Sequence, residues 1–454
     1  MVGLREAIKA ARWDGISRRD DLRWILRDRK LKELQTSPLP ILTASVIGTF
    51  EEWIDQFPLV MSRAHLSQSM AFSQFEDQPL QVVDLANYLE HESLKKMIGT
   101  AEKGRLVARN EKLSVVYKGL TPLLRKLLPV DKGFREIAGI FAQGLAENPH
   151  RPIVTFHYGV GNAVIESLKK TKTKTTPVIH YVTDPYIHKD YLKFKDEPNV
   201  YYFVFNEDTR VELEKAGVKP DKVSVAGFPI SRDLDVDLEN ASKLDEYKFQ
   251  PGRKLKVAVF TGGTGTNQDE IVAAAKSFNY SRQTPVFYCG TNYDLAERVK
   301  KELTIKNVGV RIIDDKEQLQ NDSAAEATIV VGKDMAKLLP ISYQILNWSQ
   351  VVLTKPSGDL GIEALISGKP TVVLKEWGQH EVNIHKIIRQ YGAAIETSTG
   401  LDDLGIMLSL LQSSEKLYKQ VKTLRKNLTS NSPFPLDWKN RVRQALEKIS
   451  GVQL

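Results

Sequence analysis

Two residues that could act as a general base each follow a predicted strand of a parallel sheet. His157 comes directly after the run 153–156, and Asp184 comes directly after the run 178–183. The carboxyl ends of neighbouring parallel strands meet at one edge of a sheet, where α/β domains keep their functional groups. We place the base on His157 ahead of Asp184, since an unperturbed imidazole already titrates close to neutral pH. The competing interpretation is that each residue is simply hydrogen-bonded within its loop.

A turn suited to phosphate binding interrupts the stretch 351–374. The run 351–354 predicts a strand, Ser357-Gly358 lies in the turn that ends it, and an apolar-periodic helix leads to a second strand at 370–374. The free N–H groups and positive dipole end of such a helix favour an anion. Glu363 in this helix could accept hydrogen bonds from a ribose diol. The alternative is a surface turn followed by a solvated glutamate.

A second glycine-rich turn follows the predicted strand 255–260. It contains Gly263, Thr264 and Gly265, and a helix is predicted from about Asp269. A third candidate for the base, His65, opens the helix predicted after the first strand, 41–46. The repeated order of strand, turn and helix predicts an α/β fold made of two doubly wound, Rossmann-like domains that face each other across a cleft.

The length and the linker composition divide the chain. At 454 residues it fits two domains better than one. We predict a basic helical extension over 1–36, a first domain over 37–235, a linker over 236–252, a second domain over 253–430 and a C-terminal helix over 431–454. The extension carries Trp13 and Trp24 among basic residues, a pattern that can lie in a membrane interface. We prefer the interpretation that it packs on its own protein.

The composition limits the possible partners and compartments. With 42% hydrophobic and 26% charged residues the chain is typical of soluble globular proteins, and no apolar run approaches the ~20 residues of a membrane span. The start MVGLREAIKAARWDG lacks the apolar core of a secretory signal, so we expect a cytoplasmic protein. The single cysteine, Cys289, excludes an internal disulfide and a cysteine-based zinc site. The net charge of +8 favours an anionic partner, whether a membrane, a nucleic acid or a phosphorylated substrate.

The motifs of the second domain resemble those of glycosyltransferase family 28, in the group of monogalactosyldiacylglycerol synthases and processive diacylglycerol glucosyltransferases. Five matches lie in the family's order over about 130 residues, which is far more specific than any one of them. They are Gly262-Gly263-Thr264-Gly265, Cys289-Gly290-Thr291-Asn292, the stretch 330–338, the stretch 355–370 with Glu363-Ala364-Leu365, and Gly378-Gln379 with Asn383. In the first domain Tyr181-Val182-Thr183-Asp184 and the stretch 213–229 match more loosely. The family's glycine-rich turn before His65 is absent.

The resemblance implies a GT-B architecture and an inverting, metal-independent transfer of a hexosyl group. A uridine diphosphate sugar would be the donor, no further cofactor or metal is expected, and the acceptor would be a lipid or lipid-linked molecule. The backbone around Lys333 and Met335 would hold the nucleotide base, Glu363 the ribose, and Gln379 with Asn383 the sugar hydroxyls. The glycine-rich turns would stabilise the leaving diphosphate.

The family's lipid acceptors, the net charge of +8, the basic segment 5–32 and the basic loop 169–174 together predict a peripheral protein on the inner face of the cell membrane. An anionic membrane surface is therefore the expected partner, and nucleic acid is not. Two other functions remain open from the sequence. One is a GT-B sugar-nucleotide epimerase, which would share the donor-binding half. The other is a non-catalytic nucleotide-sugar-binding protein, which the missing glycines before His65 would allow.

Overall fold

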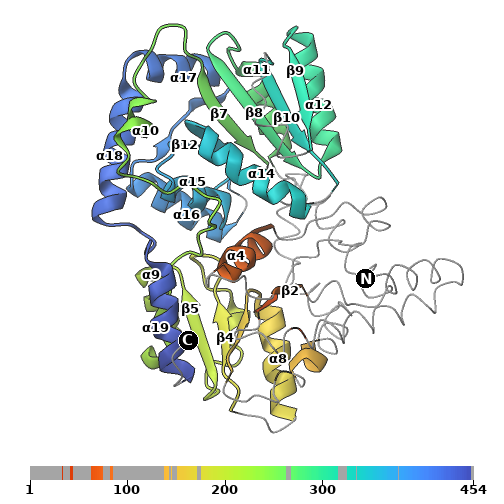
Figure 1. The fold of residues 1–454 in the computed structure, drawn as a ribbon, viewed down its shortest axis with the longest axis vertical. Coiled ribbons are helices and arrows are strands. Elements are labelled where there is room, and N and C mark those ends of the chain that lie inside the picture. Colours follow the sequence, from red (N-terminus) through yellow and green to blue (C-terminus); the bar gives the residue numbers. More distant parts are fainter. Residues whose placement is uncertain are drawn as a thin grey trace, which may run out of the picture.

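The computed structural model describes most of the second domain and, in the first, mainly the C-terminal half with a few short segments before it. The described residues are 33, 41–43, 63–74, 82–84, 138–142, 145, 151–170, 175–261, 267–314, 325–333, 335–376 and 378–450. They form two parallel sheets, each with its own helices, stacked along the long axis of the molecule (Figure 1). The predicted α/β class and two-domain GT-B architecture are therefore confirmed. All but one residue of the predicted extension 1–36 lies outside the described residues.

The first sheet has the strand order β2-β1-β3-β4-β5-β6, and all neighbouring strands described in it are parallel. β3 and β4 are buried along their whole length, as expected for strands of a parallel sheet covered by helices. The strands are β1 (Ile41–Thr43), β2 (Val82–Asp84), β3 (Ile153–Thr155), β4 (Val178–Tyr181), β5 (Val200–Val204) and β6 (Val223–Val225), and the helices are α4 (Arg63–Ser73), α8 (Tyr158–Lys170) and α9 (Glu207–Lys215), with short 3-10 turns η2 (Lys189–Leu192) and η3 (Pro220–Lys222).

The second sheet has the order β13-β12-β11-β7-β8-β10-β9. Its first strand, β7, lies between β11 and β8, so the chain reverses its winding direction there, which is where ligand crevices form in open α/β sheets. The strands are β7 (Leu255–Phe260), β8 (Gln283–Gly290), β9 (Val310–Ile313), β10 (Ala327–Val331), β11 (Val351–Thr354), β12 (Thr371–Val373) and β13 (Ala394–Ile395), followed by β14 (Ser398–Leu401). The helices are α10 (Ala241–Asp245), α11 (Gln268–Ser277), α12 (Tyr293–Ile305), α14 (Met335–Trp348), α15 (Leu360–Ile366), α16 (Gln379–Gln390), α17 (Leu404–Ser413) and α18 (Lys416–Ser430).

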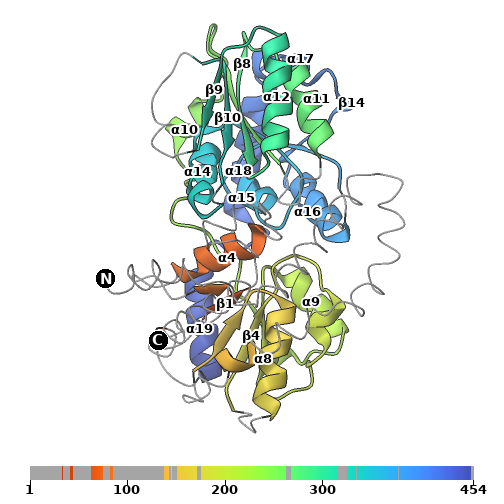
Figure 2. The ribbon, with the colours of Figure 1, turned by 90° about the vertical axis from the view of Figure 1, so that its right-hand side faces the viewer.

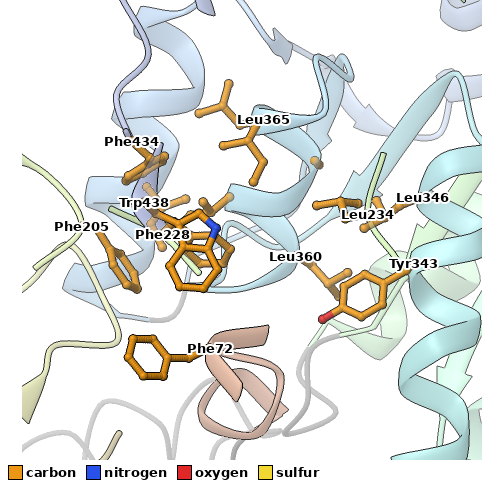
Figure 3. Close-up of a cluster of buried hydrophobic side chains, with 14 of the residues drawn as sticks. Phe72, Phe205, Phe228, Leu234, Tyr343, Leu346, Leu360, Leu365, Phe434 and Trp438 are labelled. Carbon is orange, nitrogen blue, oxygen red and sulfur yellow. The ribbon is translucent and has the colours of Figure 1, made fainter. Parts of the chain in front are cut away.

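The last helix, α19 (Trp438–Ser450), returns to the first domain and closes its core. The ring of Trp438 lies 5.9 Å from that of Phe72 in α4, and Figure 3 shows both beside Phe205 and Phe228. Gly227 has a φ of +88°, and a Cβ there would lie 2.7 Å from Pro435 O, so glycine is needed for this close approach. One apolar cluster therefore runs from the first domain into the second, including Leu360 and Leu365 of α15.

Helices of the two domains face each other at the junction. Figure 2 shows α15 and α16 of the second domain above α4 and α9 of the first. The first sheet ends at Val225 and the second begins at Leu255, with α10 between them inside the predicted linker. Because the carboxyl ends of β4 and β11 both lead to this junction, the loops that follow these strands meet there.

Candidate active site between the two domains

Helix α4 joins the ends of two strands that belong to different domains. The side-chain amide of Gln68 donates to Thr183 O at 3.0 Å and to Gly358 O at 2.8 Å. Gln68 is fully buried, so each of these hydrogen bonds replaces one that water would otherwise make. The same helix places Ser67 Oγ 3.4 Å from Glu363 Oε1, and both side chains are buried. Thus α4 holds the loop after β4 against the turn after β11.

Asp184 lies directly against this turn. A Cβ added at Gly358 would overlap Asp184 Oδ1 and would lie 3.0 Å from Thr183 O, so only glycine permits the contact. The pKa of the Asp184 carboxyl is raised above its ordinary value, mainly because the carboxyl is buried. His380 and Lys355 oppose this rise, whereas the carboxylates of Asp359 and Glu381 add to it. A carboxylate with a raised pKa takes up a proton more readily near neutral pH, as a general base must.

A buried ion pair fixes the base of the turn. Lys355 Nζ lies 2.7 Å from Glu381 Oε1, with side chains that are 12% and 2% exposed. His380 Nε2 lies 3.6 Å from the same oxygen, and Ser357 Oγ donates to Asp359 Oδ1 at 2.5 Å. Separating the two side chains would leave each charge buried and uncompensated, which is strongly unfavourable. The pair therefore ties the turn to the start of α16.

The residues predicted to hold the sugar lie on the face of α16 that meets the first domain. Gln379 Nε2 donates to Asn383 Oδ1 at 3.2 Å, and Asn383 Nδ2 donates to Pro185 O at 3.2 Å. Pro185 follows Asp184, so Asn383, Asp184 and the Gly358 turn lie in one cluster built from both domains. The structure therefore brings together Asp184, Ser357, Gly358, Glu363, Gln379 and Asn383.

His157 lies at the end of β3 with one ring nitrogen already in use. Its Nδ1 accepts a hydrogen bond from Gly159 N at 3.0 Å. In a neutral imidazole the accepting nitrogen carries no proton, so the proton sits on Nε2, which can then donate but cannot accept. The ring stacks on Tyr158 at 4.5 Å, and Tyr158 stacks on His188 at 4.8 Å. This geometry favours Asp184 over His157 as the base, the reverse of the order expected from residue type.

The remaining predicted residues are placed only in part. His65 lies in α4 and Met335 opens α14, and Lys333 is exposed just after β10. Gly263, Thr264 and Gly265 lie outside the described residues. The sequence predicts no role for Gln68, Lys355 or Glu381, although Lys355 opens one of the stretches that match the family. Gln68 bonds to residues 115 and 290 positions away, and no local pattern encodes such a pairing.

A buried histidine underlies the first-domain half of the site. His180 in β4 is fully buried, and its Nδ1 lies 3.4 Å from Thr155 Oγ1. Burial lowers the pKa of His180 from 6.5 to about 4, so the ring is neutral in the folded protein. Gly161 of α8 passes directly over the ring, where any side chain would overlap it.

We expect the folded state to lose about 2 kcal/mol of stability through His180 when the pH falls from 7 to 5. The unfolded chain takes up this proton below pH 6.5 and the folded chain only near pH 4, so the loss occurs as the pH falls through that window. Urea unfolding at both pH values measures it, and His180→Phe should remove this part of the pH dependence. The raised pKa of Asp184 makes the folded state more stable as the pH falls, which is the opposite effect. This contribution is the same in the wild type and in His180→Phe, so it cancels when their pH dependences are compared. An identical pH dependence in the variant would contradict a neutral buried His180.

The described part of the chain holds no cluster of metal-ligating side chains and no membrane-spanning helix. Within these residues, no group of three or more His, Cys, Asp or Glu side chains could hold a metal ion. Among the helices that the structure describes, none is long and apolar enough to span a bilayer.

Comparisons with known proteins support the resemblance seen in the motifs. The model of the monogalactosyldiacylglycerol (MGDG) synthase family matches residues 65–230, which run from α4 through β6. The processive diacylglycerol β-glucosyltransferase of Bacillus pumilus (strain SAFR-032) is 24% identical over 284 residues, covering 62% of this chain and 65% of that protein. The protein of the same name from Bacillus licheniformis is 21% identical over 271 residues, 59% of this chain and 63% of that one. The chain thus spans slightly less than two thirds of the length of these relatives.

One solved structure supports the fold. A Listeria monocytogenes protein proposed to be a UDP-N-acetylglucosamine 2-epimerase superposes with a TM-score of 0.50 at 14% identity, covering 91% of this chain and 96% of that one. At this identity the likeness shows the architecture alone. The resemblance to the MGDG synthase and diacylglycerol glucosyltransferase group is therefore confirmed, and the loosely matching first domain is the part that the family model recognises.

Proposed function

We propose that the protein is a hexosyltransferase that moves a hexosyl group from a uridine diphosphate sugar to a lipid acceptor of the diacylglycerol type. The observation that carries the proposal is the contact between Asp184 of the first domain and the Gly358 turn of the second. One side of this contact offers a carboxylate that can take a proton, and the other offers a helix start that can hold a diphosphate. The names of the relatives support a lipid acceptor.

The proposed reaction is a single displacement with inversion at the anomeric carbon. Asp184 takes the proton of the acceptor hydroxyl as its oxygen attacks. The bond from the anomeric carbon to the diphosphate breaks, and the electron pair leaves with the diphosphate. The N–H groups at the start of α15, with Ser357 and Gly358, stabilise the charge that develops there without a metal ion. Gln379 and Asn383 would hold the sugar hydroxyls, and Lys333 and Met335 would lie by the nucleotide base.

Purified protein incubated with labelled uridine diphosphate sugars and diacylglycerol vesicles tests the function directly. The expected result is a labelled glycolipid whose formation depends on the acceptor. Interconversion of the donor sugar without transfer would identify an epimerase instead. Donor binding with neither hydrolysis nor transfer would identify a non-catalytic binding protein.

We expect Glu363→Ala to weaken binding of uridine diphosphate by about 1.5 to 3 kcal/mol, since a hydrogen-bond acceptor that carries a charge is lost. Isothermal titration calorimetry measures the change, and Glu363→Gln keeps the side-chain shape while removing the charge. Glu297→Ala on the exposed face of α12 is the matched control and should bind like the wild type. Equal affinities in all four proteins would mean that Glu363 serves the fold alone.

A further inference from the structure

Helix α17 carries an apolar face that no described residue covers. Ile406 and Leu410 are 63% and 62% exposed and lie one turn apart. Met407 and Leu411 are half-buried beside them, and with β14 they line a groove of about 480 Å³. Single exposed aliphatic side chains are common on protein surfaces, whereas adjoining ones beside an apolar groove indicate a surface that contacts something.

Helix α18 presents a basic face next to this groove. Its exposed residues Lys416, Lys419, Lys422 and Lys426 lie opposite the buried face of the helix, and none forms an ion pair with another residue that the structure describes. Across 404–430 the only acid is Glu415, and Asp403 is the one acid among the described residues that line the groove. Lys416 itself lines the groove, so the basic and apolar surfaces are continuous.

These helices follow one long side of the molecule. Figure 1 shows α17 at one end, α18 running along that side, and α19 continuing it on the first domain. Leu436, which precedes α19, is 38% exposed, and Lys448 at its end is exposed as well. The combination therefore spans both domains.

We propose that this edge, formed by the α17 apolar face and the α18 basic face, docks on an anionic lipid surface. Basic residues attract an anionic leaflet, and aliphatic side chains between them enter the interface beside the headgroups. Charge complementarity favours a lipid surface, since four lysines that have no ion-pair partner among the described residues would repel the same basic edge of a second copy. The proposal rests on the proposed function only for the source of the lipid, because a lipid acceptor has to be reached from a membrane.

Sedimentation with vesicles of phosphatidylcholine, alone or mixed with phosphatidylglycerol, tests the docking edge. The wild type is expected to bind the anionic vesicles and to be released by high salt, since exposed charges are screened. Reversing three lysines (Lys419→Glu, Lys422→Glu, Lys426→Glu) should lower the bound fraction at least tenfold. The matched control reverses three exposed lysines at α12 (Lys300→Glu, Lys301→Glu, Lys306→Glu) and changes the net charge equally, yet it should keep most of the binding.

Leu410→Gln tests the apolar half of the edge, and its expected effect is weaker binding at every salt concentration. Equal losses in the two lysine variants would overturn the proposal, because only net charge would then matter. The proposal would also be overturned by a dimer, seen by sedimentation velocity, that Leu410→Gln dissociates, because a second copy would then cover the apolar face.

Titration with uridine diphosphate separates a failure of the docking edge from a failure of the proposed function. Normal nucleotide binding without membrane binding contradicts the docking edge, and membrane binding without sugar transfer contradicts the proposed function.

Discussion

Replacing Asp184 with asparagine is expected to lower the turnover number about 10²- to 10⁴-fold, the range that a general base contributes. Asparagine has nearly the same shape and cannot take a proton, so the contact with the Gly358 turn remains while the chemistry is lost. Burial raises the pKa of the Asp184 carboxyl, which makes the carboxylate a stronger base than an exposed aspartate. The measurement is turnover with saturating uridine diphosphate sugar and diacylglycerol vesicles.

The control for this prediction is donor affinity, which calorimetry should find nearly unchanged in Asp184→Asn. His157→Asn is the competing variant. Since Nδ1 of His157 accepts from Gly159 N, the structure leaves its other nitrogen protonated, and we expect a smaller loss of turnover. Full turnover in Asp184→Asn together with a large loss in His157→Asn would return the base to the histidine.

Replacing Gly161 with alanine is expected to lower the free energy of unfolding by about 3 kcal/mol, at the upper end for overpacked cores. The added methyl group would overlap the ring of His180 and would lie 2.7 Å from Thr155 Oγ1. Neither neighbour can move freely, because His180 and Thr155 are fully buried within adjacent strands. Urea unfolding at pH 7 measures the change.

A second variant separates this overlap from the intrinsic effect of alanine in a helix. His180→Ala removes the ring, so the double variant should lose less stability than the sum of the two single changes. Gly309→Ala, at a loop glycine whose added Cβ would have its nearest neighbour 3.8 Å away, is the control for an added methyl group without an overlap. Additive losses in the double variant would show that Gly161 does not make room for His180.

The sequence by itself determined the local elements and the chemistry of their ends. Runs rich in β-branched residues specify the strands β3, β4, β7 and β11, because such side chains suit a pleated and buried backbone. Glycines follow β3, β7 and β11 within a few residues and Asp184-Pro185 follows β4, so the sequence marks the strand ends where functional groups can approach a ligand. Asp184, Gly358 and Glu363 were identifiable by this rule, since residue type and position in an element are both local properties.

Only the tertiary structure decided which of these groups meet and what state each is in. The contact of Asp184 with Gly358 and the hydrogen bonds of Gln68 join residues more than one hundred positions apart. A local pattern of apolar and polar residues does not encode such long-range pairings. The use of His157 Nδ1 by the N–H of Gly159 depends on the backbone conformation between β3 and α8, which the residue types alone do not fix. The exposure of Ile406 and Leu410 depends on what packs against α17, because the apolar sequence of this helix would equally suit a buried one.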